Sequence, residues 1–142
     1  MFSFFKNNNK DKTTDDVFLT KVAALLIHAA KIDQVYTDDE KEIIKKTLIK
    51  LGVKNSNIDK IISEAVINEK NSNQILDYTR EIKKASEDVK INIIEALWEI
   101  IYSNKNADIY ETNLMRRLSG LMYIDNIVMS DIKEQMKNKF LK

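Results

Sequence analysis

Acidic residues concentrate in one short stretch, KIDQVYTDDE (31–40), and they are the side chains best suited to chemistry in this chain. Carboxylate oxygens are the ligands that hard cations such as Ca²⁺ and Mg²⁺ prefer. On this interpretation Asp33 and Glu40 would bind a divalent cation, with Asp38 or Asp39 as a further ligand. The spacing is not that of an EF-hand, because the third and twelfth positions counted from Asp33 are apolar.

The same residues also have the pattern of a helix start. Thr37 and Glu40 have the spacing of a capping box, in which each side chain bonds to the other residue's backbone N–H. Asp38 and Asp39 would then be favourable near the positive end of the helix dipole. Asp33 precedes the cap, so a helix start does not require it, although it would suit an Asx turn. Capping therefore explains Glu40 better than metal binding does, whereas Asp33 stays a candidate ligand.

A second polar loop, SNKNADIYE (103–111), repeats this arrangement further along the chain. Asp108 occupies a cap position, Glu111 follows it three residues later, and Asn104 stands where the first loop has an aspartate. Because Asn104 is neutral, we expect the second loop to bind a cation more weakly than the first. The predicted ligands for a divalent cation, Ca²⁺ or Mg²⁺, are Asp33, Glu40, Asn104, Asp108 and Glu111.

Residue combinations that perform catalysis are absent from the sequence. The chain has no Cys and one His, His28, and it offers no other soft ligand for a zinc site. No Ser or acid has a spacing that suggests a catalytic triad, and there is no phosphate-binding loop. The sequence therefore predicts a protein that is not an enzyme, and we expect His28 to pack in the core or at an interface.

Charge is nearly balanced, with 23 basic and 22 acidic residues and a net charge of +1. Such a balance provides no electrostatic attraction toward nucleic acid, so no nucleic-acid partner is predicted. Arg occurs only at Arg80, Arg116 and Arg117. The pairs Lys45-Lys46 and Arg116-Arg117 are interpreted as solvated faces or, alternatively, as contacts for an anion or a partner.

The N-terminal stretch MFSFFKNNNKDK lacks the apolar region of a secretory signal, and no run approaches the ~20 apolar residues of a transmembrane segment. Together with the absence of Cys, this predicts a cytoplasmic protein. Residues 1–13 are predicted to be a flexible tether. Phe2, Phe4 and Phe5 would be costly to leave in water, so we expect them to dock on this domain, on a neighbouring chain or, as a peripheral contact, on a membrane.

The composition predicts an all-α fold. The chain has no Pro and two Gly, and its apolar residues recur at helical spacing. We predict about seven helices in a single domain over residues 14–142, with Gly52 providing a left-handed stop for the second helix. The predicted helix starts are Thr14, Thr37, Asn55 or Ser56, Ser72, Ser86, Asp108 and Ser130.

An internal duplication is predicted from two helices that are apolar nearly all round, VAALLIHAA (22–30) and IIEALWEII (93–101). Placing Leu26 on Leu97 also brings together the caps, the acids that follow them and the apolar positions beyond, and we call this correspondence the repeat alignment. The sequence thus predicts two helix-loop-helix halves related by a pseudo-two-fold axis, with the two apolar helices packed at the centre.

These loops resemble the A-D-G-x-I-x-x-x-E loops that follow the central helices of tellurite-resistance TerB-like proteins. The N-terminal domain of the DjlA co-chaperone looks similar. The stretch EALWEIIYSNKNADIYETNLMRRLSGLM (95–122) is the closer match, with a Leu-Trp pair before the loop and a paired Arg after the Glu. There are departures, because Gln34 and Lys105 replace the family's Gly and Asn104 replaces the second Asp.

The resemblance implies a non-enzymatic bacterial module associated with stress, with an acidic surface that binds a divalent cation weakly. The alternative that it leaves open is a protein-interaction or co-chaperone-type adaptor without a metal role. Either class implies a protein partner, which the residues do not name.

Overall fold

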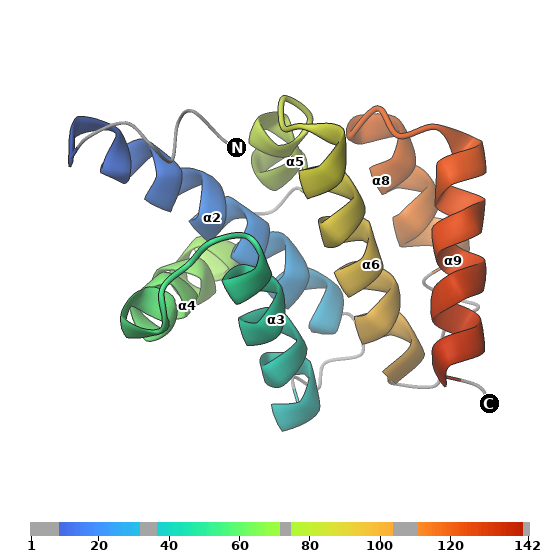
Figure 1. The fold of residues 1–142 in the computed structure, drawn as a ribbon, viewed down its shortest axis with the longest axis horizontal. Helices are drawn as coiled ribbons and strands as arrows, with labels where there is room; N and C mark the ends of the chain where they lie inside the picture. Colours follow the sequence, from blue (N-terminus) through green and yellow to red (C-terminus); the bar gives the residue numbers. More distant parts are fainter. Residues whose placement is uncertain (1–8, 32–36, 72–74, 104–110, 141–142) are drawn as a thin grey trace.

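The computed structural model describes residues 9–31, 37–71, 75–103 and 111–140, and these residues form helices and short connections without a strand (Figure 1). The elements in chain order are α2 (Asn9–Ala30), α3 (Asp38–Lys50), α4 (Asn55–Asn71), α5 (Leu76–Ile82), α6 (Glu87–Ser103), the π-helical segment η1 (Glu111–Met115), α8 (Arg116–Leu121) and α9 (Asn126–Phe140). The prediction of an all-α fold with about seven helices is confirmed.

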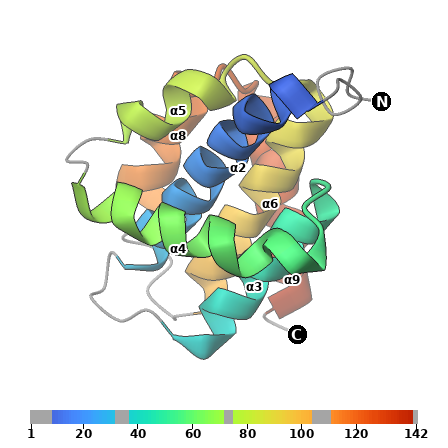
Figure 2. The ribbon, with the colours of Figure 1, turned by 90° about the vertical axis from the view of Figure 1, so that its left-hand side faces the viewer.

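Helices α2 and α6 are the two apolar helices predicted to be central. Helix α2 packs against α3, α4, α5 and α6, and Figure 2 shows it running between α4 and α5. Helix α6 lies between α2 and α9 in Figure 1 and also contacts α3. Leu26 and Leu97 are fully buried. Neighbours on several sides explain why these helices are apolar nearly all round rather than along one stripe.

The correspondence between the two halves extends beyond the predicted helix-loop-helix units to a third helix. Helices α4 and α9 begin at Asn55 and Asn126, which coincide in the repeat alignment. Helix α4 packs against α2, and α9 packs against α6 in the same way. Three buried positions of α4, Ile58, Ile61 and Ala65, correspond to Met129, Ile132 and Met136 of α9, which are also buried. Each half therefore contains three helices, and α5 connects them.

The second helix ends with the same backbone turn in each half. Gly52 follows α3 with a φ of 108°, and Tyr123, its counterpart in the repeat alignment, follows α8 with a φ of 55°. The N–H of Val53 donates to Leu48 O at 3.0 Å, and that of Ile124 donates to Ser119 O at 3.0 Å. These are the long hydrogen bonds of a Schellman motif, so the predicted left-handed stop at Gly52 is confirmed.

Some predicted helix boundaries are confirmed and others are wrong. The Ser86 hydroxyl accepts a hydrogen bond from Val89 N at 3.4 Å and caps α6, as predicted. Helix α2 begins at Asn9 rather than at Thr14, so the last part of the segment predicted as a tether is helical. The prediction of Ser130 as the start of the last helix is also wrong. Helix α9 begins one turn earlier, because an Asp125 carboxylate oxygen accepts from Ile127 N at 2.7 Å and caps it there.

Other predictions of this kind lie outside the described residues. They include the helix starts at Ser72 and Asp108 and the docking of Phe2, Phe4 and Phe5. Within the described ranges, none of the helices has the length and apolar character needed to cross a membrane.

Candidate functional site

The acidic loops were the first candidate site in the sequence. Asp33, Asn104 and Asp108 lie outside the described residues, and Glu111 begins the π-helical segment η1. Within the part of the chain that the structure describes, three or more His, Asp or Glu side chains are nowhere grouped so that they could hold a metal ion. Divalent-cation binding by these loops therefore stays a prediction.

Glu40 is placed by the cap of α3, as the capping interpretation predicted. Its side chain is buried, and its Oε1 accepts hydrogen bonds from Thr37 N at 2.8 Å and from Thr37 Oγ1 at 3.1 Å. In return Glu40 N donates to Thr37 Oγ1 at 3.2 Å, which completes the capping box. Asp38 and Asp39 are exposed in the first turn of α3, where the positive end of the helix dipole stabilises their charge.

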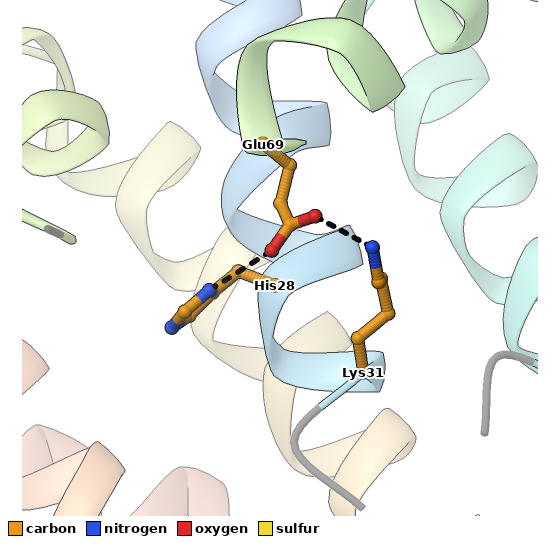
Figure 3. A network of polar contacts seen from close by, with 3 residues as sticks. All are labelled: His28, Lys31 and Glu69. Atoms are coloured by element: carbon orange, nitrogen blue, oxygen red, sulfur yellow. Dashed lines mark hydrogen bonds and ion pairs between the residues drawn. The ribbon is translucent and has the colours of Figure 1, made fainter. Parts of the chain in front are cut away.

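The only histidine of the chain belongs to a polar network at the end of α2 (Figure 3). Glu69, in the last turn of α4, points between His28 and Lys31. Its Oε1 accepts from Lys31 Nζ at 2.8 Å, and its Oε2 lies 3.3 Å from His28 Nδ1. Burial raises the pKa of the Glu69 carboxyl, but hydrogen bonds from Lys31 and His28, together with their charges, lower it by more. The net shift of the Glu69 pKa is downward, so this carboxylate is ionised at neutral pH.

A groove of about 580 Å³ opens beside this network, between the end of α2, the start of α5 and α8. Figure 2 shows α5 and α8 lying together at one side of α2. We call this groove the arginine groove. Its lining residues are His28, Ile75, Leu76, Arg116, Arg117, Gly120 and Leu121.

Charged and apolar side chains meet in the arginine groove. Arg116 and Arg117 are exposed, and within the described part of the chain neither forms an ion pair or a hydrogen bond through its side chain. Ile75 is buried, while Leu76 and Leu121 are partly accessible and give the groove an apolar surface. Two guanidinium groups beside apolar side chains can bind a ligand that has both carboxylate and apolar groups.

Sequence reasoning identified some of these residues and missed how they are combined. The sequence predicts that the Arg116-Arg117 pair is a solvated face or a contact for an anion or a partner, and the structure shows both residues exposed on a groove. His28 was expected in the core or at an interface, and it lies half-buried at the contact of α2 with α4. The groove is formed by α2, α5 and α8, which are distant in sequence, and no local sequence pattern predicts that these helices lie side by side.

Comparison with known proteins identifies the family. Neither the curated proteins nor the solved structures contain a match to this chain. The family model described as "Tellurite resistance protein TerB" matches residues 19–134. This range contains the end of α2, all of α3 to α8, most of α9 and both acidic loops. Because the match covers most of the sequence and both of its halves, the chain belongs to the TerB family.

Proposed function

We propose that this TerB-family module is non-enzymatic and acts by docking a protein partner in the arginine groove. The observation that carries the proposal is the presence of two exposed arginines without an ionic partner in the described chain, placed at the edge of an apolar surface. Arginine is enriched among the residues that contribute most to binding at protein interfaces, and the buried centre of an interface is more apolar than its rim.

The chemistry of the groove supports binding rather than catalysis. Among the described lining residues, the one that commonly acts as a general base is His28, and its side chain contacts Glu69. Among the described residues of the groove lining there is no Ser, Thr, Cys, Asp or Glu that would serve as a nucleophile or as a second acid–base group. The family's link to tellurite resistance supports a role in stress, which would be exerted through the partner.

Photo-crosslinking tests the proposed docking surface directly. A photoreactive amino acid is placed at Leu76, which is 39% exposed in the groove, and at Ile49, which is 50% exposed on α3 and serves as the matched control. We expect one defined partner to be crosslinked in cells from position 76 and not from position 49. The same partner should disappear when Arg116 and Arg117 are changed to Ala. Equal crosslinking from both positions would contradict the proposal.

A second candidate function is weak divalent-cation binding at the first acidic loop. The observation that favours it is the exposure of Asp38 and Asp39 beside the segment that contains Asp33. The Asp38 side chain is fully exposed, and its one close cation is Lys41 at 3.9 Å within the described residues. Titration calorimetry with Ca²⁺, Mg²⁺ and Mn²⁺ tests this function, which does not depend on the arginine groove.

A further inference from the structure

The internal duplication shows what the arginine groove lacks. In the repeat alignment, Lys46 corresponds to Arg117 and Glu99 corresponds to His28. Lys46 of α3 pairs with Glu99 of α6, with Nζ 2.9 Å from Oε2. Arg117 of α8 and His28 of α2 line one groove, but at this place the acid has been replaced by a histidine. Arg117 therefore keeps the positive charge that Lys46 has in the other half, but no carboxylate stands at the position that corresponds to Glu99.

Among the side chains that the structure describes, no neighbouring acid supplies the missing carboxylate. Glu69 is the acid that contacts His28, and both of its oxygens are engaged, Oε1 by Lys31 and Oε2 by His28. The described residues that line the arginine groove include no Asp or Glu. An exposed guanidinium in such a place is available to a carboxylate from another molecule, which it can bind through two parallel hydrogen bonds.

From this difference between the halves, we infer that the docked partner presents an acidic segment that also carries apolar side chains. A carboxylate of the partner takes the place that Glu99 has in the other half and pairs with Arg117, and a second one pairs with Arg116. Apolar side chains of the same segment cover Leu76 and Leu121. The inference rests on the proposed function and names the chemical class of the partner.

Other occupants fit the groove less well. Proteins bind single-stranded nucleic acid largely by stacking bases on aromatic side chains, and no Phe, Tyr or Trp is found among the lining residues that the structure describes. Residues 1–10 of the protein contain Lys6 and Lys10 but no Asp or Glu, so this segment cannot provide carboxylates to two arginines. Charge complementarity therefore favours an acidic segment of another protein.

Binding of defined peptides tests the inference. The probe is a fluorescent peptide with the sequence DELLEELLD, measured by anisotropy at physiological ionic strength. One control peptide, NQLLQQLLN, lacks the charges, and another, DEGGEEGGD, lacks the apolar side chains. We expect the full-length protein to bind the first peptide at least about tenfold more tightly than either control, because both kinds of contact contribute.

Two protein variants locate the peptide. Changing Arg116 and Arg117 together to Ala should weaken binding by about tenfold or more, whereas Arg80→Ala, at the chain's third arginine, should leave it unchanged. A more specific variant restores the missing acid. His28→Glu, made together with Glu69→Gln to avoid repulsion between the two acids, should pair internally with Arg117 and compete with the peptide. Glu69→Gln alone is its matched control, and it should bind the peptide at least as tightly as the wild type does, because it keeps both arginines and removes a negative charge beside the groove.

The outcomes separate the inference from the proposed function. If no acidic peptide binds while crosslinking from position 76 still captures a groove-dependent partner, the inference is wrong and the proposed function stands. Peptide binding that survives loss of both arginines would also overturn the inference. Self-association of the chain that requires both arginines, without peptide binding, would assign the groove to a second copy and overturn it as well.

Discussion

At the scale of single residues, the two halves of this protein use the same positions for different chemistry. Lys46 and Glu99 form an ion pair, whereas the corresponding Arg117 and His28 line an open groove. His28 instead turns to Glu69, which it shares with Lys31. A histidine in place of the acid therefore means that the second half lacks this intramolecular ion pair and that its exposed arginine is available to a partner.

The Glu69 network makes stability depend on pH with a definite sign. The pKa of the Glu69 carboxyl is lower in the folded than in the unfolded protein. The stabilisation that Glu69 provides is therefore fully present above the unfolded-state pKa of about 4.3, and it is lost as pH falls through the folded-state pKa. Glu69→Gln should cost up to about 1 kcal/mol at neutral pH, because the Lys31 side chain is 39% exposed and solvent screens the pair. Urea unfolding of both proteins as a function of pH measures the difference.

We expect the difference between wild type and Glu69→Gln to shrink toward zero below about pH 4. Glu64→Gln, at an exposed position of the same helix, should show little effect at any pH. A constant difference down to acid pH would mean that Glu69 acts through packing rather than through its charge.

A change at Asp33 tests the metal candidate. Because Asp33 precedes the capping box of α3, Asp33→Asn should weaken any divalent-cation binding and alter the free energy of unfolding by less than about 0.5 kcal/mol. Titration calorimetry and urea unfolding check the two parts. The same heat from wild type and variant would exclude Asp33 as a ligand, and no heat from wild type at millimolar cation would leave the loop as a helix start.

At the scale of elements, the start of α3 is determined by its capping box. Thr37→Ala removes the acceptor for Glu40 N and should lower the free energy of unfolding by about 1 kcal/mol. Glu40→Gln should cost less, because an amide oxygen can still accept from Thr37 N and Oγ1. Chemical denaturation ranks the two variants, and a larger loss for Glu40→Gln would show that the carboxylate charge itself is needed at this buried position.

The paired turns after α3 and α8 offer a test of backbone strain. Gly52 has a φ of 108° and open space around its Cα, so Gly52→Ala should destabilise by about 1–2 kcal/mol through backbone strain alone. Tyr123 adopts a φ of 55° with a side chain that is 70% exposed. Tyr123→Gly should therefore relieve strain and be close to neutral in thermal unfolding. A loss of about 0.5–1 kcal/mol at Tyr123 would instead point to its contact with Lys83, whose Nζ lies 5.6 Å from the ring centroid.

At the scale of the whole molecule, sequence reasoning predicted what depends on local pattern. The apolar character of α2 and α6, the cap at Thr37 and the stop at Gly52 follow from residues close in sequence, and the structure confirms them. The last helix was misplaced because Ser130 gave a stronger visible signal than Asp125, which is the residue that caps α9.

Contacts between residues that are distant in sequence could not be predicted from local sequence patterns. His28 and Glu69 are distant in sequence, and their contact depends on how α4 crosses α2. The arginine groove depends on the packing of α5 and α8 beside α2, which no periodicity encodes. The duplication held a usable signal, because the repeat alignment that places Leu26 on Leu97 also places His28 on Glu99 and Lys46 on Arg117. Comparing those pairs would have indicated where one half lacks an acid.

The most direct measurement is amide chemical-shift mapping by NMR during titration with the peptide DELLEELLD. We predict saturable shifts at Leu76, Gly120 and Leu121 in the arginine groove, with no shift at Ile49 on α3. The shifts should vanish when Arg116 and Arg117 are both changed to Ala. Saturable shifts confined to other surfaces, or a spectrum unchanged at peptide concentrations well above that of the protein, would contradict the assignment of this groove as the partner site.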